Sequence, residues 1–418
     1  MKIKVGVVFG GKTVENEVSI ISAIQAMNQM DTEKYEIIPI YISKDRTWYT
    51  GKMLDDIDIY KDFENLKKYA KKVTLYQKDG GFYLQKLTGF KTIVAELDII
   101  FPIVHGNNVE DGSLQGYFET IGIPYVGPGV IGSALGMDKI IQKQVFESSG
   151  IPVVPYTWFY DNEYSQEQEK IKKDVEKLGF PVIVKPATLG SSVGINVVKK
   201  MEELDDAIFE ASKYAEKIIV ESVVENLVEV NCSVLGNHEF MDTSVIEEVL
   251  SSDEILSYKD KYIGRSKGKK SKGMASASRI VPARIEENLA KEVVEISKKA
   301  FRSLNLSGVC RMDYLIDKKN KKVYLNEPNT IPGSLAFYLW SPKGKKYRDL
   351  LDEMITTAIN DYKNSSKKIC NFDTNILSNF SGNKGSKGLK GLKNKINWFI
   401  IAWLMYKIFV HENYIITL

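Results

Sequence analysis

Apolar residues in the first third of the chain recur with two different periods, which predict strands separated by helices. We expect strands at IKVGVVF, YEIIPIYIS and LDIIFPIVHG, with a shorter strand at IPYVG. Between them, VSIISAIQAMNQM repeats its apolar positions with a period near that of a helix. This alternation predicts an α/β domain with a parallel sheet over residues 1–127. Within it, VTLYQKDGGFYLQKL predicts an inserted hairpin that turns at Asp-Gly-Gly.

The pattern of elements changes after residue 127. Residues 128–224 contain the helical segment MDKIIQKQVFESSG, an extended YTWF, another helix and the strand–loop–strand segment PVIVKPATLGSSVGINVVKK. Residues 225–364 contain the strands VEVNCSVLG, GVCRMDYLID and KKVYLNEPN, two helices and a basic loop at 257–279. We therefore predict two further subdomains of mixed α and β structure, followed by a tail of different character at 365–418.

Composition and charge narrow the classes of protein. The 418 residues are 44% hydrophobic and 27% charged, as in an ordinary globular protein, and the net charge of +3 gives no argument for nucleic-acid binding. The three cysteines are odd in number and far apart, which argues against a disulfide framework and for a reducing compartment. None of the three histidines lies near a cysteine, which argues against a zinc site.

The segment GVVFGGKT matches the phosphate-binding P-loop pattern, but its context argues against a P-loop. Val7, Val8 and Phe9 continue an apolar run, and only five residues precede Gly6, too few for a central strand before a loop. We predict a strand over residues 3–9, a glycine turn and a helix that begins near residues 14–17. Lys12 is then not a P-loop lysine.

A second glycine-rich segment, KPATLGSSVG, lies between two β-runs. Its glycines and serines can present several backbone N–H groups to one anion, and Lys185 ends an apolar strand where a lysine needs a negative partner. We interpret the segment as a phosphate clamp. The alternative is a solvated hairpin with a lysine at the end of its strand.

The segments RMDYLID and VYLNEPNTIPG give the sharpest chemical signal. Arg311 and Asp313 occupy alternate positions of one strand, and Glu327 and Asn329 do the same on the next. If the strands pair, one face carries carboxylate and amide oxygens beside an arginine, which suits Mg²⁺ bound together with phosphates. The alternative is a surface cluster of ion pairs on a hairpin.

Two loops are also candidates for function. The loop HGNNVEDGSLQG follows a predicted parallel strand, so His105 lies where α/β sheets commonly bind ligands. Its alternative role is a hydrogen bond to the loop backbone. The basic loop at 257–279 is either a lid over phosphates or a solvated charged loop.

Taken together, the motifs resemble one family. GGKTVENEVSIISA, HGNNVEDGSLQG, GMDK, VIVKPATLGSSVG, GVCRMDYLID and NEPNTIPG, in this order, resemble the D-alanine–D-alanine ligases of the ATP-grasp superfamily. That family includes relatives that make D-Ala–D-Ser or D-Ala–D-lactate in vancomycin resistance. The resemblance covers residues 1–364 and implies an ATP-grasp fold, in which a Rossmann-like domain is followed by two α+β subdomains that sandwich ATP. It also implies ligation of two D-alanines through a D-alanyl phosphate, for peptidoglycan precursors.

The resemblance also implies roles for individual residues. The first D-alanine would be bound by Glu15 with its partners Ser191 and Tyr262, in a pocket lined by His105. ATP would be bound by Lys139, Lys185, Glu221, Val224, Glu229 and the lid residue Lys261. Two Mg²⁺ or Mn²⁺ ions would be held by Asp313, Glu327 and Asn329, and the oxyanion would be stabilised by Arg311 and the backbone N–H of Gly333.

The second substrate is less well defined. Tyr338 occupies the position of a family serine that receives the carboxylate of the second substrate, and Ser334 is an alternative from earlier in IPGSLAFYLW. The pair Lys261-Tyr262 resembles the D-Ala–D-Ala type, so we favour D-alanine over D-serine. The connection VESVVENLVEV is one residue longer than in the family, and the lysine-rich lid has no interpretation. Another ATP-grasp ligase should lack Glu15 and the HGNNVEDG loop, and a degenerate nucleotide-binding protein should have lost Arg311 or a metal ligand.

The tail and the assembly complete the expectations. SGNKGSKGLKGLKNK is basic and glycine-rich, and INWFIIAWLMYKIFV is almost entirely apolar but short for a transmembrane helix. The tail could contact a membrane surface, pack on the ligase or a partner subunit, or be a non-functional extension with an altered reading frame. By resemblance we also expect a cytoplasmic homodimer.

Overall fold

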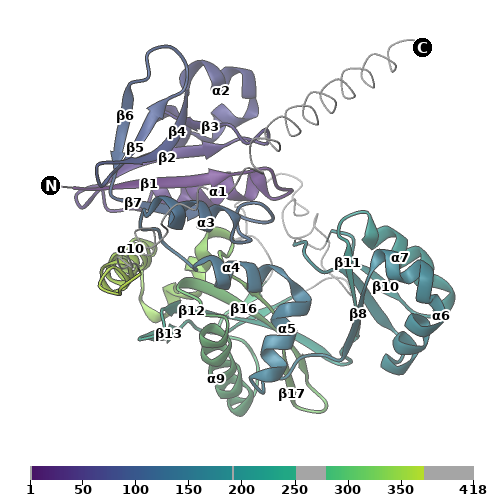
Figure 1. The fold of residues 1–418 in the computed structure, drawn as a ribbon. Helices are drawn as coiled ribbons and strands as arrows, with labels where there is room; N and C mark the ends of the chain where they lie inside the picture. The colour runs from purple at the N-terminus through teal and green to yellow at the C-terminus, as the bar shows by residue number, and fades with distance from the viewer. Residues whose placement is uncertain (1, 191–192, 251–278, 371–418) are drawn as a thin grey trace, which may run out of the picture. The chain divides into compact units, whose positions relative to one another are not determined.

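The computed structural model describes residues 2–190, 193–250 and 279–370 of the chain (Figure 1). The predicted lid and most of the tail, with Ser191, Lys261 and Tyr262, lie outside these residues. Contacts divide the chain into two compact units, residues 1–365 and 366–418. The described residues of the first unit form three sheets, one in each of the stretches 1–127, 128–224 and 225–364. Domain boundaries at these positions stay a prediction.

The first sheet has seven strands in the order β6-β5-β4-β3-β2-β1-β7. Its centre is parallel, because β1 (Ile3–Gly10) pairs with both β2 (Tyr35–Ile42) and β7 (Ile99–Ile103). The other strands are antiparallel: β3 (Trp48–Thr50), β4 (Lys71–Lys78), β5 (Gly81–Lys86) and β6 (Ile93–Leu97). The α-helices of this stretch are α1 (Asn16–Met27), α2 (Phe63–Tyr69) and α3 (Ser113–Ile121). The inserted hairpin and the strand over GVVF are confirmed.

One predicted strand does not form. The segment IPYVG makes a single parallel bridge, between Tyr125 and Ile100. Pro124 has no N–H to extend the ladder, and Gly127 turns the chain away with a φ of 105°. The segment therefore ends as a loop that leads toward α4 (Val130–Met137).

The second sheet has four strands in the order β10-β9-β11-β8, and all of its pairings are antiparallel. These strands are β8 (Tyr156–Tyr160), β9 (Val182–Pro186), β10 (Asn196–Val198) and β11 (Lys217–Ser222). Helices α6 (Asp161–Leu178) and α7 (Leu204–Ser212) bury apolar residues against one face (Figure 1). On the other face, Ile140 of helix α5 (Lys139–Ser148) packs on Ile219.

The third sheet follows the order β15-β14-β12-β16-β17, with β13 paired to β12. Its strands are β12 (Leu227–Gly236), β13 (Met241–Thr243), β14 (Glu247–Val249), β15 (Arg279–Ile280), β16 (Gly308–Asp317) and β17 (Lys322–Asn329). Alternate residues of β12 and β16, such as Val230 and Met312, form a core with helix α9 (Glu287–Ser303). Helix α10 (Tyr347–Ser365) packs into the core of the first sheet. The short 3-10 helices in the described part of the chain are η1 (Lys52–Asp55), η2 (Ile57–Lys61), η3 (Met201–Glu203), η5 (Gly333–Leu339) and η6 (Ser341–Lys343).

The hairpin of β16 and β17 contains a β-bulge. Asp313 pairs with Glu327, but the next residue, Tyr314, pairs with Leu325, so Asn326 is an extra residue on β17. Leu325 lies in the core, and under strict alternation Glu327 would lie there too. The bulge reverses the facing of the strand, so that Pro328 is buried and Glu327 is partly exposed.

Candidate active site

The face of the third sheet opposite α9 carries two rows of polar residues. Register places Glu247, Asn231, Asp313 and Glu327 in one row across β14, β12, β16 and β17. The neighbouring row contains Ser233, Arg311 and Asn329. The four residues predicted from the sequence as a metal and oxyanion site therefore do share one face.

Hydrogen bonds connect three of these four residues, Arg311, Asp313 and Asn329. Arg311 donates to both oxygens of Asp313, from Nε to Oδ1 and from Nη2 to Oδ2, each over 2.7 Å. Asn329 Nδ2 also donates to Asp313 Oδ2, over 2.9 Å. Burial alone would disfavour the charge of Arg311, but the adjacent Asp313 raises the pKa of the guanidinium well above its ordinary value. Arg311 is therefore a permanent buried cation.

Helix α5 brings two lysines to this region. Asp138 caps the helix by accepting from the backbone N–H of Ile140 and Ile141, which puts Lys139 at its first position. Lys139 Nζ lies 3.1 Å from Glu327 Oε2 and donates to the carbonyl of Leu189 in the glycine–serine loop over 3.0 Å. The predicted phosphate clamp and the acidic hairpin are thus joined through one lysine.

Lys185 and Glu221 form a buried ion pair. Lys185 Nζ donates to Glu221 Oε2 over 2.5 Å, and Lys143 of α5 lies 3.1 Å from the other oxygen, Oε1. Burial opposes the ionised form of Glu221, but the two lysines overcome it and lower the pKa of the carboxyl to about 2. Lys143 did not emerge from the sequence, although its spacing of four residues from Lys139 predicts the same face of the helix.

The loop at 105–116 contributes His105 and Glu110. His105 Nε2 lies 3.1 Å from Ser22 Oγ, and burial lowers the pKa of the imidazole to about 4, so it is neutral at pH 7. Glu110 was not predicted. It accepts from the backbone N–H of Gly106 over 2.9 Å, and its other oxygen accepts from the hydroxyl of Thr330 and the N–H of Ile331. This carboxyl therefore ties the loop to the segment that follows β17.

Glu110 gives a prediction for the pH dependence of stability. Burial, with the nearby charge of Glu15, raises the pKa of Glu110 to about 7 from an ordinary value of 4.5. A raised pKa means that the folded state holds the proton more tightly, so this contribution is complete below pH 4.5 and is lost as the pH rises through 7. Between pH 5 and 8 we expect the wild type to lose roughly 2 to 3 kcal/mol of unfolding free energy relative to Glu110→Gln. Urea unfolding at three pH values would measure it, and parallel pH profiles would contradict it.

Glu15 lies where the glycine loops meet. A methyl group placed on Gly190 of the glycine–serine loop would lie 3.2 Å from Glu15 Oε2, and one on Gly106 would lie 2.9 Å from the same atom. Both glycines therefore allow the backbone to approach this carboxylate closely. The predicted partners of Glu15, Ser191 and Tyr262, lie outside the described residues.

The segment after β17 places Ser334 and Tyr338 in different surroundings. Ser334, Leu335 and Ala336 all have positive φ values near 50°, a left-handed turn that is costly for residues other than glycine. The backbone N–H of Ser334 donates to Ser22 Oγ, the same atom that contacts His105, and its hydroxyl donates to Gln25. The turn also includes Gly333, the predicted oxyanion residue.

Tyr338 faces a separate cluster on the polar side of the sheet. Its hydroxyl donates to Glu247 Oε1 over 2.9 Å, and Arg279 lies over its ring at 3.9 Å. Asn231 donates to the same oxygen of Glu247, and Arg279 lies 3.3 Å from the other. Burial raises the pKa of Tyr338 to about 12, so the hydroxyl stays protonated. Glu247 was not recognised from the sequence.

The remaining candidates for ATP binding are Glu229 and Val224. Glu229 lies two residues before Asn231 on β12 and shares its face, and Val224 follows β11 in a partly exposed connection. No cluster of three or more histidine, cysteine or acidic side chains that could hold a metal ion occurs among the described residues. The metal site predicted from the sequence consists of two carboxylates and an amide, which ligand oxygens would complete.

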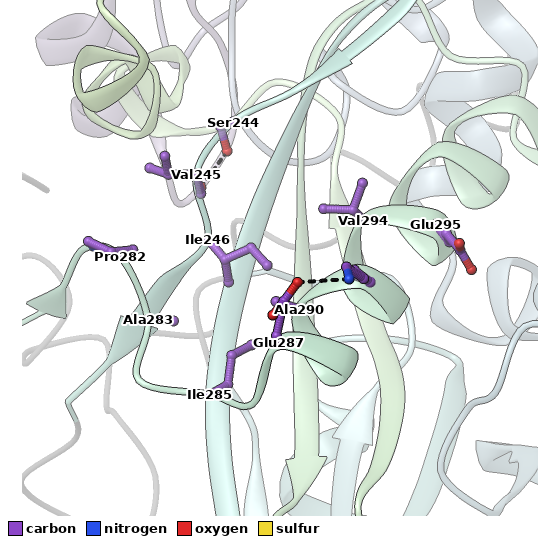
Figure 2. Close-up of a pocket in the computed structure, with 11 residues that line it drawn as sticks. Ser244, Val245, Ile246, Pro282, Ala283, Ile285, Glu287, Ala290, Val294 and Glu295 are labelled. Carbon is purple, nitrogen blue, oxygen red and sulfur yellow. Dashed lines mark hydrogen bonds and ion pairs between the residues drawn. The ribbon is translucent and has the colours of Figure 1, made fainter.

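The described part of the chain also has an apolar pocket of about 450 Å³ away from these residues. It lies between α9 and the segment from Ser244 to Ile246, with Pro282 and Ile285 at its wall (Figure 2). Glu287 and Lys291 pair across 2.7 Å at its edge. Since α9 covers the face of the sheet opposite Arg311, the pocket is not part of the candidate site.

Lys12 lies in an exposed turn after β1, and it gives a second prediction. Its carbonyl accepts from Asn108 over 3.3 Å, and no helix begins at its position. We expect Lys12→Ala to change the KM for ATP less than about twofold, and Lys185→Ala to raise it at least roughly tenfold, since a charge-assisted contact to phosphate is lost. Steady-state kinetics would rank the two variants, and the reverse order would restore the P-loop interpretation.

Comparisons with known proteins agree with this arrangement. Residues 4–128 match the family described as the D-ala D-ala ligase N-terminus, and residues 145–356 match the D-ala D-ala ligase C-terminus. The chain is 40% identical over 377 residues to a D-alanine–D-alanine ligase of Thermosipho melanesiensis, which covers 90% of this chain and 98% of that one. Its identity to a ligase of the same name from Caldicellulosiruptor bescii is 39%, over 88% and 97% of the two chains.

Solved structures give the same result for the fold. The VanG D-Ala:D-Ser ligase of Enterococcus faecalis superposes with a TM-score of 0.72 at 31% identity, over 86% of this chain and 100% of that one. The D-alanine–D-alanine ligase of Coxiella burnetii superposes with a TM-score of 0.71 at 29% identity, over 88% and 96%. With these likenesses added to the polar face, the lysines of the clamp and the glycine loops around Glu15, the chain belongs to the D-alanine–D-alanine ligase family.

Proposed function

We propose that this protein joins two D-alanines into D-alanyl-D-alanine with ATP as the energy source, for use in peptidoglycan precursors. Membership of the family supports the reaction, because the curated relatives above carry that activity in their names. The observation that carries the proposal on this chain is the contact of Lys139 with Glu327. It brings the cations of the phosphate clamp against the acidic, arginine-bearing face of the third sheet.

The first half of the reaction forms an acyl phosphate. A carboxylate oxygen of the first D-alanine attacks the γ-phosphorus of ATP, and the bond from that phosphorus to ADP breaks. Lys139 and Lys185 would bind the phosphates, and Glu15 would hold the ammonium of this D-alanine. Fixing both reactants removes much of the entropic barrier to the transfer.

The second half forms the peptide bond. The amine nitrogen of the second D-alanine attacks the acyl carbon, loses a proton, and inorganic phosphate leaves with the electron pair of the broken C–O bond. Negative charge develops on the carbonyl oxygen of the tetrahedral centre. Arg311, buried and permanently charged, is the stabilising group, with the backbone N–H of Gly333 as its partner.

The donors on the polar face fit divalent metal ions. Asp313 and Glu327 offer carboxylates and Asn329 an amide oxygen, all on one face, and Mg²⁺ or Mn²⁺ accepts such ligands together with phosphate oxygens. Two such ions would neutralise charge on the transferred phosphate. Arg311 and Asn329 contact Asp313, and Lys139 contacts Glu327, and each carboxylate has further lone pairs that could bind a metal ion.

A phosphate-release assay with D-alanine, D-serine or D-lactate as second substrate tests the proposal. We expect phosphate release that depends on D-alanine, with the dipeptide identified by mass spectrometry. Absence of release above the control without amino acid would overturn the proposal. Faster turnover with D-serine would instead identify the alternative, a D-Ala–D-Ser ligase.

The tail gives a third prediction. The family match ends at residue 356, and the predicted catalytic residues lie before residue 340. We expect a chain that ends at residue 370 to keep kcat within about twofold of the full-length value, because every predicted catalytic residue is retained. Loss of activity on truncation, measured in the same assay, would assign the tail to the enzyme.

The cellular location follows from the proposed reaction. Its substrates, ATP and D-alanine, are metabolites of the cytoplasm, which supports a cytoplasmic site of action. No helix among the described residues has the length and apolarity needed to span a membrane. A homodimer and weak contact of the tail with anionic lipid are further proposals, and sedimentation and liposome flotation would test them.

A further inference from the structure

Lys143 is a buried cation without a role in the reaction as described. It lies one turn after Lys139 on α5, and its side chain is 1% exposed. Its ammonium lies 3.1 Å from Glu221 Oε1, while Lys185 occupies Oε2 at 2.5 Å. One carboxylate thus pairs with two ammonium groups, one at each oxygen.

Packing does not account for a charge at this position. Burial lowers the pKa of Lys143, and the neighbouring Lys185 lowers it further, while Glu221 acts in the opposite direction. An ion pair buried this deeply is commonly no more stabilising than apolar side chains of the same volume. A methionine would fill the space of Lys143 without the cost of desolvating an ammonium.

The two lysines differ in what they can reach. Lys185 lies near the end of β9, where the chain enters the glycine–serine loop, and its side chain is 10% exposed. Lys143 lies deeper, with its ammonium 5.9 Å from the centre of the Tyr156 ring. Only Lys185 borders the loop that is suited to phosphates, so it is the lysine that can exchange partners.

We propose that Lys143 is a positioning residue, which keeps Glu221 paired while Lys185 turns from this carboxylate to the phosphates of the nucleotide. The inference rests on the proposed function, because it requires a nucleotide with phosphates at the clamp. Without Lys143, binding of phosphates to Lys185 would leave Glu221 buried and unpaired. Glu221 would then retain Lys185 and compete with the nucleotide.

The test is Lys143→Met, with ADP and adenosine as probes in calorimetric titrations of the full chain. We expect the Kd for ADP to rise about tenfold or more, because a buried carboxylate loses its remaining partner when Lys185 leaves. The Kd for adenosine should change less than about twofold, because a ligand without phosphates does not draw Lys185 away. A matched control is Lys217→Met, which removes a lysine paired with Asp138 over 2.6 Å, and it should leave both constants unchanged.

Two results would overturn the inference. An unchanged Kd for ADP would mean that Lys185 does not depend on Lys143, and equal weakening of ADP and adenosine would indicate a general distortion of the site. Lys143→Gln has the same expected outcome and replaces the methionine variant if that variant does not fold. A wild type that binds ADP but releases no phosphate with D-alanine would sink the proposed function alone, since the comparison of ADP with adenosine does not use the reaction.

Discussion

Replacing Glu327 by glutamine is expected to lower kcat by about a thousandfold at saturating ATP and D-alanine, because several kcal/mol of charge stabilisation at the phosphates would be lost. Glu327 lies beside Asp313 across the hairpin, and its oxygen pairs with Lys139 at 3.1 Å. Glutamine keeps the size of the side chain but replaces the carboxylate by a neutral amide, which is a weaker ligand for a divalent metal ion. Steady-state phosphate release would measure the loss of kcat. Titration with Mn²⁺, followed by electron paramagnetic resonance, would measure the metal affinity separately.

The control for this variant is Glu286→Gln. Glu286 is also a carboxylate paired with a lysine, Lys321, at 2.8 Å, but it lies on the surface, with 53% of its side chain exposed. An exposed pair contributes little, so kcat should stay within about twofold. Near-normal turnover of Glu327→Gln at saturating Mg²⁺ would show that this carboxylate is not a metal ligand.

Arg311→Met is expected to lower kcat by about a hundredfold to a thousandfold with a smaller change in the KM for ATP. The charge of Arg311 is needed most when the tetrahedral oxyanion forms, after ATP has bound. The side chain is 11% exposed and holds Asp313 through two hydrogen bonds of 2.7 Å. Steady-state kinetics of phosphate release would separate the effect on kcat from that on KM.

Arg284→Met is the matched control for this second variant. Arg284 also donates two hydrogen bonds to a carboxylate, that of Glu248, but its side chain is 64% exposed. Its loss should affect stability slightly and turnover little. If Arg311→Met raises the KM for ATP while kcat is kept, the guanidinium serves nucleotide binding, and the oxyanion role is wrong.

The elements of the fold were largely predictable because hydrophobic periods are local. The apolar run in GVVF and the alternation in the strands of the acidic hairpin gave the correct elements, and the alternation placed Arg311 and Asp313 on one face. The strand expected at IPYVG failed because a pattern of apolar residues does not report whether a neighbour can complete the ladder. Residues whose partners are distant are the hardest to find in this way.

In the candidate site, too, residues whose partners are distant in the chain were not found from the sequence. Glu110 stands within a loop that the sequence marked as interesting, but its partners Thr330 and Ile331 lie more than 200 positions away in the chain. Ser334 begins a run of three left-handed residues, which gives it different surroundings from Tyr338. Local propensities do not predict such a turn. Lys143 could have been found, since helical spacing alone aligns it with Lys139.

The bulge at Asn326 makes the hairpin tolerant of one particular change in length. Deleting this one residue would restore strict alternation, with Leu325 and Pro328 still facing the apolar layer against α9 and Glu327 still opposite Asp313. A gap at Pro328 would instead carry Asn329 into that layer. For protein engineering, the damage done by a deletion in this strand therefore depends on its position, and homologous hairpins should be aligned by the facing of their carboxylates rather than by residue count.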